Sequence, residues 1–264
     1  MHLSRIRVAV NTIPTTWGVH PVLGHWLGHD ISSYAVFMGL GVATGIGVYL
    51  YEARQHHRLG ERGILIAIGS LIGGTIGAKL LEWSIHLRFV FDHLHDWPAL
   101  LSGRTIVGGF IGGTIGVMVT KRLLKITDKR GNFFAPGIAL GVAIGRIGCF
   151  LRGCCYGKPT TLPWGVDFGD HIARHPTQLY ESLFMLIMFG MIQHWKKRPN
   201  LRPGQLFNWL MIAYFIYRFF VEFIKVEPVS YGGLTVFQYI SVLVLLYLTR
   251  TTWMKWLKPK PAAQ

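Results

Sequence analysis

Seven long apolar stretches, separated by short polar segments, dominate the pattern of this chain. They cover residues 32–52, 63–83, 105–121, 133–152, 178–194, 205–224 and 235–250. Each is close to the roughly 20 residues that an α-helix needs to cross the hydrocarbon core of a bilayer. The pattern predicts an all-α polytopic membrane protein with seven transmembrane helices. No linker or low-complexity segment divides the chain, so residues 1–264 are expected to form a single integral membrane domain.

Composition supports a membrane protein. Hydrophobic residues make up 51% of the chain and charged residues only 15%, whereas soluble domains have roughly 25% charged residues. The N-terminal stretch up to Asp30 is interrupted by Pro14, Pro21 and several histidines, so it lacks the continuous apolar core of a signal peptide. No cleaved signal is expected.

The distribution of basic residues predicts the orientation of the helices. Segments at and after the ends of the first, third, fifth and seventh stretches hold 16 Lys and Arg residues, whereas the N-terminal segment and the other three loops hold 8. Basic loops stay in the cytoplasm, so the N-terminus is expected outside and the C-terminus inside. The net charge of +15 is then a topology signal that favours membrane lipids as partners, and no nucleic-acid partner is expected.

Glycines recur four residues apart in the first four stretches. They are Gly41/Gly45, Gly69/Gly73/Gly77, Gly108/Gly112/Gly116 and Gly137/Gly141/Gly145. This spacing of small residues lets the backbones of membrane helices approach closely. The second to fourth stretches are therefore expected to form a tight inner bundle.

Charged residues inside the apolar stretches are functional candidates, because a charge at membrane depth is costly. Arg146 lies near the outer end of the fourth stretch. In the sixth, Tyr214, Arg218 and Glu222 are four residues apart and share one helix face. Other polar residues expected near the same side are Lys79, Glu82, His175, Gln178 and Glu181. We expect polar groups from four helices to converge on the extracytoplasmic side.

Two interpretations of these charges are compatible with the sequence. Arg218 and Glu222 can form a purely structural ion pair. Arg146 has no acid within one helical turn. Two arginines at similar depth with few acids predict an anion between them, and guanidinium groups match phosphate oxygens in bidentate geometry. A lipid headgroup is the expected anion. His175, beside Pro176 in a polar loop, is either structural or holds a substrate.

Cys149, Cys154 and Cys155 are the three cysteines of the chain. An odd number within seven residues argues against a disulfide framework. Their spacing lacks the paired CxxC of a structural zinc site, so no metal is expected. A reactive thiol, activated by Arg152 or by a helix end, and small apolar filler are both compatible with the sequence.

Further motifs occur in a fixed order along the chain. They are His20-Pro21-Val22-Leu23 followed by Tyr34, then Gly145-Arg146-Ile147-Gly148, Tyr156-Gly157, Pro163-Trp164, Arg174-His175-Pro176-Thr177-Gln178-Leu179-Tyr180-Glu181 and Tyr214-x3-Arg218-x2-Val221-Glu222-Phe223. Together they resemble the prolipoprotein diacylglyceryl transferase family, from about residue 20 to residue 250. The resemblance implies a bacterial inner-membrane enzyme with seven helices and an active site facing the periplasmic side.

The family moves the diacylglyceryl group of phosphatidylglycerol to the thiol of a lipobox cysteine in a prolipoprotein, and releases glycerol 1-phosphate. The resemblance therefore implies phosphatidylglycerol and lipoprotein precursors as partners, and no cofactor. It implies Arg146, Arg218 and Tyr214 as catalytic residues, with the arginines holding the phosphodiester. The residues implied to bind or shape the substrate are Gly157, His175, Gln178, Glu181, Glu222, Gly108, Gly109 and Cys149.

The chain departs from the family's motifs within the implied site. Val107-Gly108-Gly109 stands where the family usually has His-Gly-Gly, so a histidine often assigned a catalytic role is absent. Cys149 and Cys154 replace a usual asparagine and an acidic residue, and Lys79 stands where an arginine is common. Two other functions therefore stay compatible with the sequence: a related phospholipid-headgroup transferase with a different acceptor, and a non-catalytic lipid-binding membrane protein.

Overall fold

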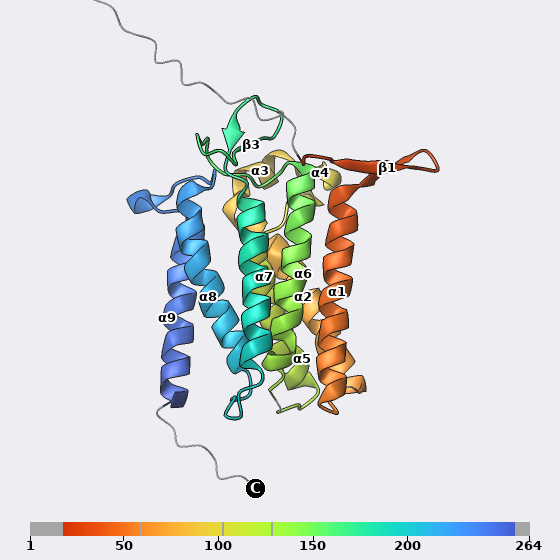
Figure 1. Cartoon of the computed structure of the whole chain (residues 1–264), viewed down its shortest axis with the longest axis vertical. Coiled ribbons are helices and arrows are strands. Elements are labelled where there is room, and N and C mark those ends of the chain that lie inside the picture. Colours follow the sequence, from red (N-terminus) through yellow and green to blue (C-terminus); the bar gives the residue numbers. More distant parts are fainter. Residues whose placement is uncertain (1–17, 59, 102, 128, 257–264) are drawn as a thin grey trace, which may run out of the picture. The chain divides into compact units, whose positions relative to one another are not determined.

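The structure is a computed structural model that describes residues 18–58, 60–101, 103–127 and 129–256. Its long helices are α1 (Ser33–Gln55), α2 (Glu61–Ile85), α5 (Ile106–Leu123), α6 (Gly131–Arg152), α7 (Thr177–Trp195), α8 (Gln205–Val221) and α9 (Val236–Trp256), labelled in Figure 1. The predicted N-terminal features up to Pro14, and the basic residues Lys258 and Lys260, lie outside the described residues.

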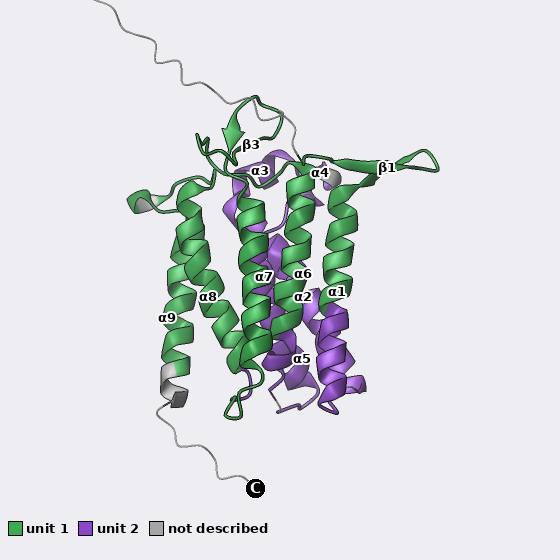
Figure 2. Cartoon of the chain, in the orientation of Figure 1, with its two compact units in different colours: residues 1–45, 135–201, 205–264 green, residues 46–134, 202–204 purple. Residues whose placement is uncertain are grey.

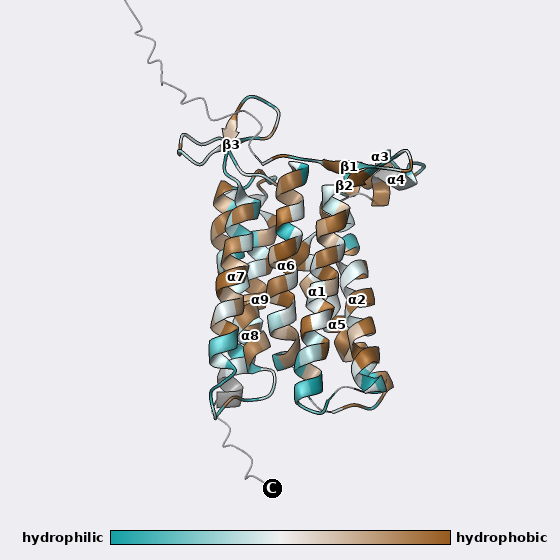
Figure 3. Ribbon diagram, turned by 45° about the vertical axis from the view of Figure 1, so that its right-hand side comes forward, coloured by the Kyte–Doolittle hydropathy of each residue, from teal (hydrophilic) through white to brown (hydrophobic). Residues whose placement is uncertain are grey.

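Each predicted apolar stretch coincides with one of these long helices. Among the described residues, five helical segments are long and apolar enough to cross a membrane: α1, α2, α5, α6 and Gln205–Ile224, which includes α8. The apolar part of α9, Val236–Thr252, is shorter. Helix α7 carries Gln178 and Glu181 in its first two turns. Figure 3 shows apolar residues along most of the length of the long helices. The chain is thus mostly helical and of the all-α membrane class.

The chain divides into two compact units, which Figure 2 distinguishes by colour. The first comprises residues 1–45, 135–201 and 205–264, and the second comprises residues 46–134 and 202–204. Helices α1 and α6 each begin in one unit and end in the other.

In the second unit, α2 packs closely on α5 through facing glycines. A Cβ atom at Gly77 would lie 2.5 Å from the carbonyl oxygen of Gly108 and 2.6 Å from the Cα atom of Gly112. Only glycine permits so close an approach of two helix backbones. The short helices α3 (Leu87–Asp92) and α4 (Trp97–Leu101) connect α2 to α5, and the Thr105 hydroxyl caps α5 by accepting from the Gly108 N–H at 3.2 Å.

In the first unit, α6 packs on the N-terminal part of α1, again through glycines. A Cβ atom at Gly41 would lie 2.5 Å from the Gly141 carbonyl oxygen, and one at Gly45 would lie 3.1 Å from that of Gly137. Within the units, glycines pair α2 with α5 and α6 with α1, and the expected bundle of the second to fourth stretches stays a prediction. Small residues permit close approach without choosing the partner. Helix α8 packs against both α7 and α9.

Short strands and turns tie the loops of the first unit together. Strands β1 (Val22–Trp26) and β2 (His29–Ser32) form an antiparallel hairpin before α1, and β3 (Val166–Asp167) pairs with β4 (Ala173–Arg174) between α6 and α7. Gly157 pairs with Lys225, which follows the 3-10 helix η1 (Glu222–Ile224). A second 3-10 helix, η2 (Tyr231–Gly233), precedes α9. The loop after α6 is therefore held against the end of α8.

Candidate functional site

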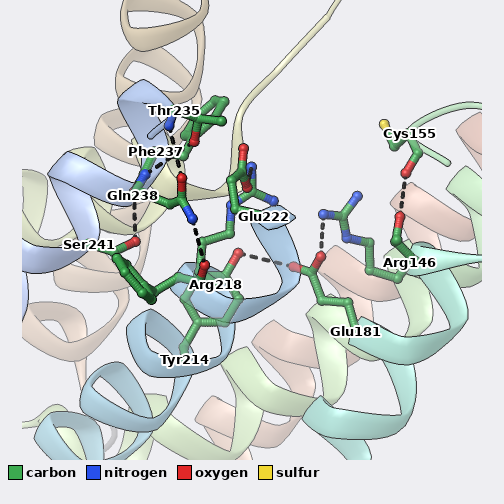
Figure 4. A network of polar contacts seen from close by, with 12 residues as sticks. Arg146, Cys155, Glu181, Tyr214, Arg218, Glu222, Thr235, Phe237, Gln238 and Ser241 are labelled. Carbon is green, nitrogen blue, oxygen red and sulfur yellow. Dashed lines mark hydrogen bonds and ion pairs between the residues drawn. The ribbon is translucent and has the colours of Figure 1, made fainter. Parts of the chain in front are cut away.

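Polar side chains from α6, α7 and α8 meet inside the first unit (Figure 4). Arg146 on α6 forms an ion pair with Glu181 on α7. The hydroxyl of Tyr214 on α8 donates a hydrogen bond to the other carboxylate oxygen of Glu181 at 3.0 Å. The three residues are 5%, 1% and 0% exposed. Glu181 thus links three helices through both of its oxygens.

A second ion pair extends this cluster from α8 to η1. The guanidinium of Arg218 lies 3.0 Å from the carboxylate of Glu222, as the four-residue spacing predicts, and both residues are buried. The same guanidinium stacks 4.5 Å from the ring centre of Phe237 on α9. The structure confirms that Arg218 and Glu222 form an ion pair, and its purely structural role stays a prediction. We call Arg146, Glu181, Tyr214, Arg218 and Glu222 the arginine cluster.

The charge balance of the arginine cluster corrects one expectation. The sequence has no acid within a helical turn of Arg146, but the fold brings in Glu181 from another helix. Glu181 lies near the N-terminal end of α7 and is buried. Side-chain spacing along one helix cannot show a partner that arrives from a neighbouring helix.

Several buried polar atoms around the cluster lack a hydrogen-bond partner among the described residues. They are the Nε atoms of Arg146 and Arg218, the Oε1 atom of Gln178, the hydroxyl of Tyr217 and both carboxylate oxygens of Glu222. An unsatisfied buried polar atom costs about 1–3 kcal/mol, and such atoms are rare in proteins. The cluster therefore offers unpaired guanidinium donors and unpaired oxygen acceptors to a polar ligand.

The N-terminus of α7 holds the turn that follows α6. Gln178 Nε2 donates to the carbonyl oxygen of Cys154 at 2.5 Å, and Thr177 Oγ1 donates to that of Cys155 at 2.7 Å. One turn further along α7, Ser182 Oγ donates to the Ala143 carbonyl at 2.8 Å. Gln178, which the sequence places in the site, therefore positions the loop, and its Oε1 atom is buried without a hydrogen-bond partner among the described residues.

Gly157 sits where three segments meet. A Cβ atom there would lie 2.5 Å from the Ile224 carbonyl oxygen, 2.8 Å from His175 Cβ and 2.9 Å from Thr177 Cγ2. Its N–H donates to the His175 carbonyl at 2.8 Å. No side chain fits without moving backbone atoms, which is a physical reason for glycine at this position.

Changing Gly157 to Ala is expected to lower stability by about 1–3 kcal/mol, because the added methyl group overpacks a site bounded by the Ile224 carbonyl and by the side chains of His175 and Thr177. Thermal unfolding of the purified protein measures the loss. The matched control is Gly190→Ala on α7, where a Cβ atom meets nothing within 4 Å. Equal melting temperatures for the two variants would contradict the close packing at Gly157.

His175 is brought to this junction, and its ring lies beside Tyr180. Its Nδ1 atom is 3.3 Å from the Tyr180 hydroxyl, which also accepts a hydrogen bond from Trp164 Nε1 at 2.8 Å. These contacts give His175 a role in fixing the loop. Gly108 and Gly109 lie in the second unit, where Gly108 belongs to the contact between α2 and α5. Their implied substrate contact stays a prediction.

The three cysteines gather at the end of α6. Cys149 is buried, and its Sγ atom lies 3.9 Å from Arg146 Nη1. Hydrogen bonds from Cys149 and Cys154 hold the pKa of the Cys155 thiol well below its ordinary value, whereas hydrogen bonding to Cys149 and Cys155 raises the pKa of the Cys154 thiol. Cys149 therefore lies next to Arg146, as the sequence motif implies.

Lys225 is a site residue that the sequence analysis missed. It is 6% exposed. Burial lowers its pKa to about 8, with further contributions from the nearby cations Arg218 and Arg146. Its backbone pairs with Gly157. Lys225 lies beyond the end of α8, after η1, with an extended backbone, so helical spacing from Arg218 gave no sequence signal for it. A third cation therefore adds to the positive potential beside the arginine cluster.

Apolar helices and a buried cluster of charged residues define a multi-pass membrane protein with a candidate anion site among its helices. The sequence model of the prolipoprotein diacylglyceryl transferase family matches residues 21–254. The chain belongs to this family.

Individual relatives agree over nearly their full lengths. A phosphatidylglycerol–prolipoprotein diacylglyceryl transferase of Clostridium tetani is 34% identical over 236 residues, which cover 86% of this chain and 94% of the relative. One of Finegoldia magna is 34% identical over 226 residues, covering 83% and 89%. One of Coxiella burnetii is 32% identical over 260 residues, covering 88% and 91%.

Proposed function

We propose that this protein transfers the diacylglyceryl group of phosphatidylglycerol to the lipobox cysteine thiol of prolipoproteins and releases glycerol 1-phosphate. Family membership supports the reaction class, and the names of the relatives supply the donor and the acceptor. The observation that carries the proposal for the site is the buried pair Arg146 and Arg218, on two different helices, each with an unpaired Nε atom. Two such donors suit the oxygens of one phosphodiester.

The arginine cluster would act on the departing phosphate. Attack at the glyceryl carbon breaks its bond to the phosphate oxygen, so negative charge grows on the leaving glycerol phosphate. Arg146 and Arg218 would stabilise this charge through hydrogen bonds that are already oriented before the reaction. Glu181 and Glu222 would hold the two guanidinium groups in place, and Tyr214 would position the headgroup.

The other half of the reaction is the formation of a thioether. The acceptor thiol loses its proton, and the resulting thiolate sulfur bonds to the glyceryl carbon. One proton is released and a glycerol phosphate departs, so the charges balance. Gly157, Gln178 and His175 would shape the loop that borders the headgroup, in keeping with their backbone contacts in the structure.

The membrane arrangement is part of the same proposal. All seven long helices would cross the bacterial inner membrane, with the N-terminus outside, the C-terminus in the cytoplasm and the site facing the periplasmic side. The alternation of basic loops along the sequence supports this orientation. Helices α7 and α9 would cross as part of the bundle, sheltered by packing against α8.

The cysteines favour one alternative. Cys149 lies beside Arg146 in place of the asparagine that the family usually has. A related headgroup transferase with another acceptor would keep Arg146 and Arg218 and would differ in the residues beside them, such as Cys149. A non-catalytic lipid-binding protein would keep the arginines without turnover.

The test is to incubate the purified protein with phosphatidylglycerol vesicles and a peptide that carries a lipobox cysteine. Release of glycerol phosphate, together with a diacylglyceryl mass increase on the cysteine, is expected. A peptide with serine in place of that cysteine serves as the matched acceptor control and is expected to stay unmodified. Glycerol phosphate release without modification of the peptide would favour another acceptor. Binding of phosphatidylglycerol without release of glycerol phosphate would contradict the proposed transferase activity.

A further inference from the structure

The turn after α6 brings the three cysteine thiols together. The Sγ atoms of Cys149, Cys154 and Cys155 all lie within 4.8 Å of one another. Sequence spacing argued against a metal because the paired CxxC pattern is absent. In the structure, the conformation of the chain at the end of α6 brings the three sulfur atoms together.

The helix end explains the juxtaposition of Cys149 and Cys154. Gly153 has a φ of 76°, its N–H donates to the Phe150 carbonyl at 2.9 Å, and the Cys154 N–H donates to the Cys149 carbonyl at 3.1 Å. This pair of bonds is the Schellman motif, which places the second residue after the helix beside the residue five positions earlier. Residues 149 and 154 are therefore neighbours by backbone geometry.

Cys155 completes the group through an unusual backbone conformation. Its φ is 64°, a left-handed value that residues other than glycine rarely adopt. Such conformations persist where surrounding contacts impose them, and they cluster at functional sites. The hydrogen bonds from Thr177 to the Cys155 carbonyl and from Gln178 to the Cys154 carbonyl supply the contacts. The Sγ atoms of Cys154 and Cys155 end 3.7 Å apart.

The sulfur separation matches metal coordination. A tetrahedral zinc site with Zn–S bonds of about 2.3 Å puts two sulfur atoms about 3.8 Å apart. Thiolates are the ligands that select zinc and monovalent copper over harder cations. Three thiolates around a divalent ion carry one net negative charge, and the cationic guanidinium of Arg146 lies beside it, 3.9 Å from Cys149 Sγ.

We propose that Cys149, Cys154 and Cys155 form a binding site for a single thiophilic metal ion of the zinc or monovalent-copper type, with three sulfur ligands and one open coordination position. Each cysteine bonds to the metal through its sulfur and releases its proton to solvent. An open fourth position is typical of sites that bind a further ligand, whereas closed four-ligand sites are structural. The metal site borders the arginine cluster through the contact between Cys149 and Arg146, but binding of the ion does not require the proposed transferase reaction.

The test is to titrate the reduced, full-length protein in lipid nanodiscs with Cd2+ as the probe. Sulfur-to-metal charge-transfer absorption is expected to saturate at one Cd2+ per chain, and Zn2+ is expected to compete. Each of Cys149→Ser, Cys154→Ser and Cys155→Ser is expected to weaken binding at least about tenfold, since each removes a direct ligand. The matched control is His25→Gln, which removes an exposed histidine in the β1–β2 hairpin and is expected to leave the titration unchanged.

Alkylation of the wild-type protein gives a second readout that needs no variant to fold. Iodoacetamide labelling followed by mass spectrometry is expected to modify the accessible Cys154 and Cys155 in the absence of metal and to spare both at saturating Cd2+. Unprotected cysteines at saturation would overturn the proposal, as would Cd2+ binding that survives every serine substitution. Neither readout involves turnover, so failure of the metal site and failure of the transferase assignment are separate results.

Discussion

Replacing Arg146 by lysine is expected to lower kcat/KM for the proposed transfer at least about 100-fold, which corresponds to about 3 kcal/mol of transition-state stabilisation. Lysine keeps the charge and can still pair with Glu181. It loses the planar fork and the Nε–H that in the structure has no protein partner. The effect should therefore fall on the reaction more than on the fold. Arg218→Lys is expected to behave in the same way, because Arg218 Nε is likewise unpaired.

The measurement is the initial rate of glycerol phosphate release at several phosphatidylglycerol concentrations, alongside a thermal unfolding curve. Arg152→Lys is the matched control on the same helix, since Arg152 is exposed and stacks 5.1 Å from the centre of the Tyr34 ring. It is expected to stay within about twofold of the wild-type rate, as its charge is retained outside the arginine cluster. Near-normal turnover by Arg146→Lys would show that the reaction does not need the planar guanidinium group of Arg146.

Replacing Glu181 by alanine is expected to destabilise the protein by about 3–5 kcal/mol, because it leaves the buried Arg146 without its counter-ion. It also removes the acceptor of the Tyr214 hydroxyl. A fall in melting temperature of about 10 °C is the expected size for such a loss in a domain of this length. The comparison is Asp170→Ala, which breaks an exposed ion pair with Arg174 and is expected to leave the melting temperature little changed.

A double variant separates stability from function at the same position. Arg146→Met with Glu181→Leu replaces the buried ion pair by apolar side chains, and such replacements are often neutral or stabilising. We expect it to recover most of the stability that Glu181→Ala loses, while the transfer stays abolished. Recovery of transfer together with stability would show that the pair has only a structural role.

The sequence predicted the helices well because each apolar stretch has to hide its backbone in a helix wherever it meets lipid. It also predicted the face shared by Tyr214, Arg218 and Glu222, because four-residue spacing fixes which side chains stack on one helix. It placed Arg146 among the site candidates because a charge in an apolar stretch is conspicuous. All three are properties of a single segment.

The partners of these residues were beyond the reach of sequence spacing. Glu181 and Arg146 are 35 positions apart in the chain, and only the packing of α7 on α6 makes them an ion pair. Lys225 was missed because it follows the apolar stretch and looks like an ordinary loop cation. The glycine spacing predicted close contacts between helices, but only the structure shows that α6 packs on α1.

By itself, the sequence determined that this chain is a helical membrane protein, which residues lie on each helix face, and which motifs link it to a family of lipid transferases. These follow from local periodicity and from the high cost of placing polar groups in lipid. Only the tertiary structure decided that Glu181 neutralises Arg146, that Lys225 adds a third buried cation, and that three cysteines share one small volume. Those outcomes depend on helix packing and on a single helix-ending turn, which bring together groups that the chain holds apart.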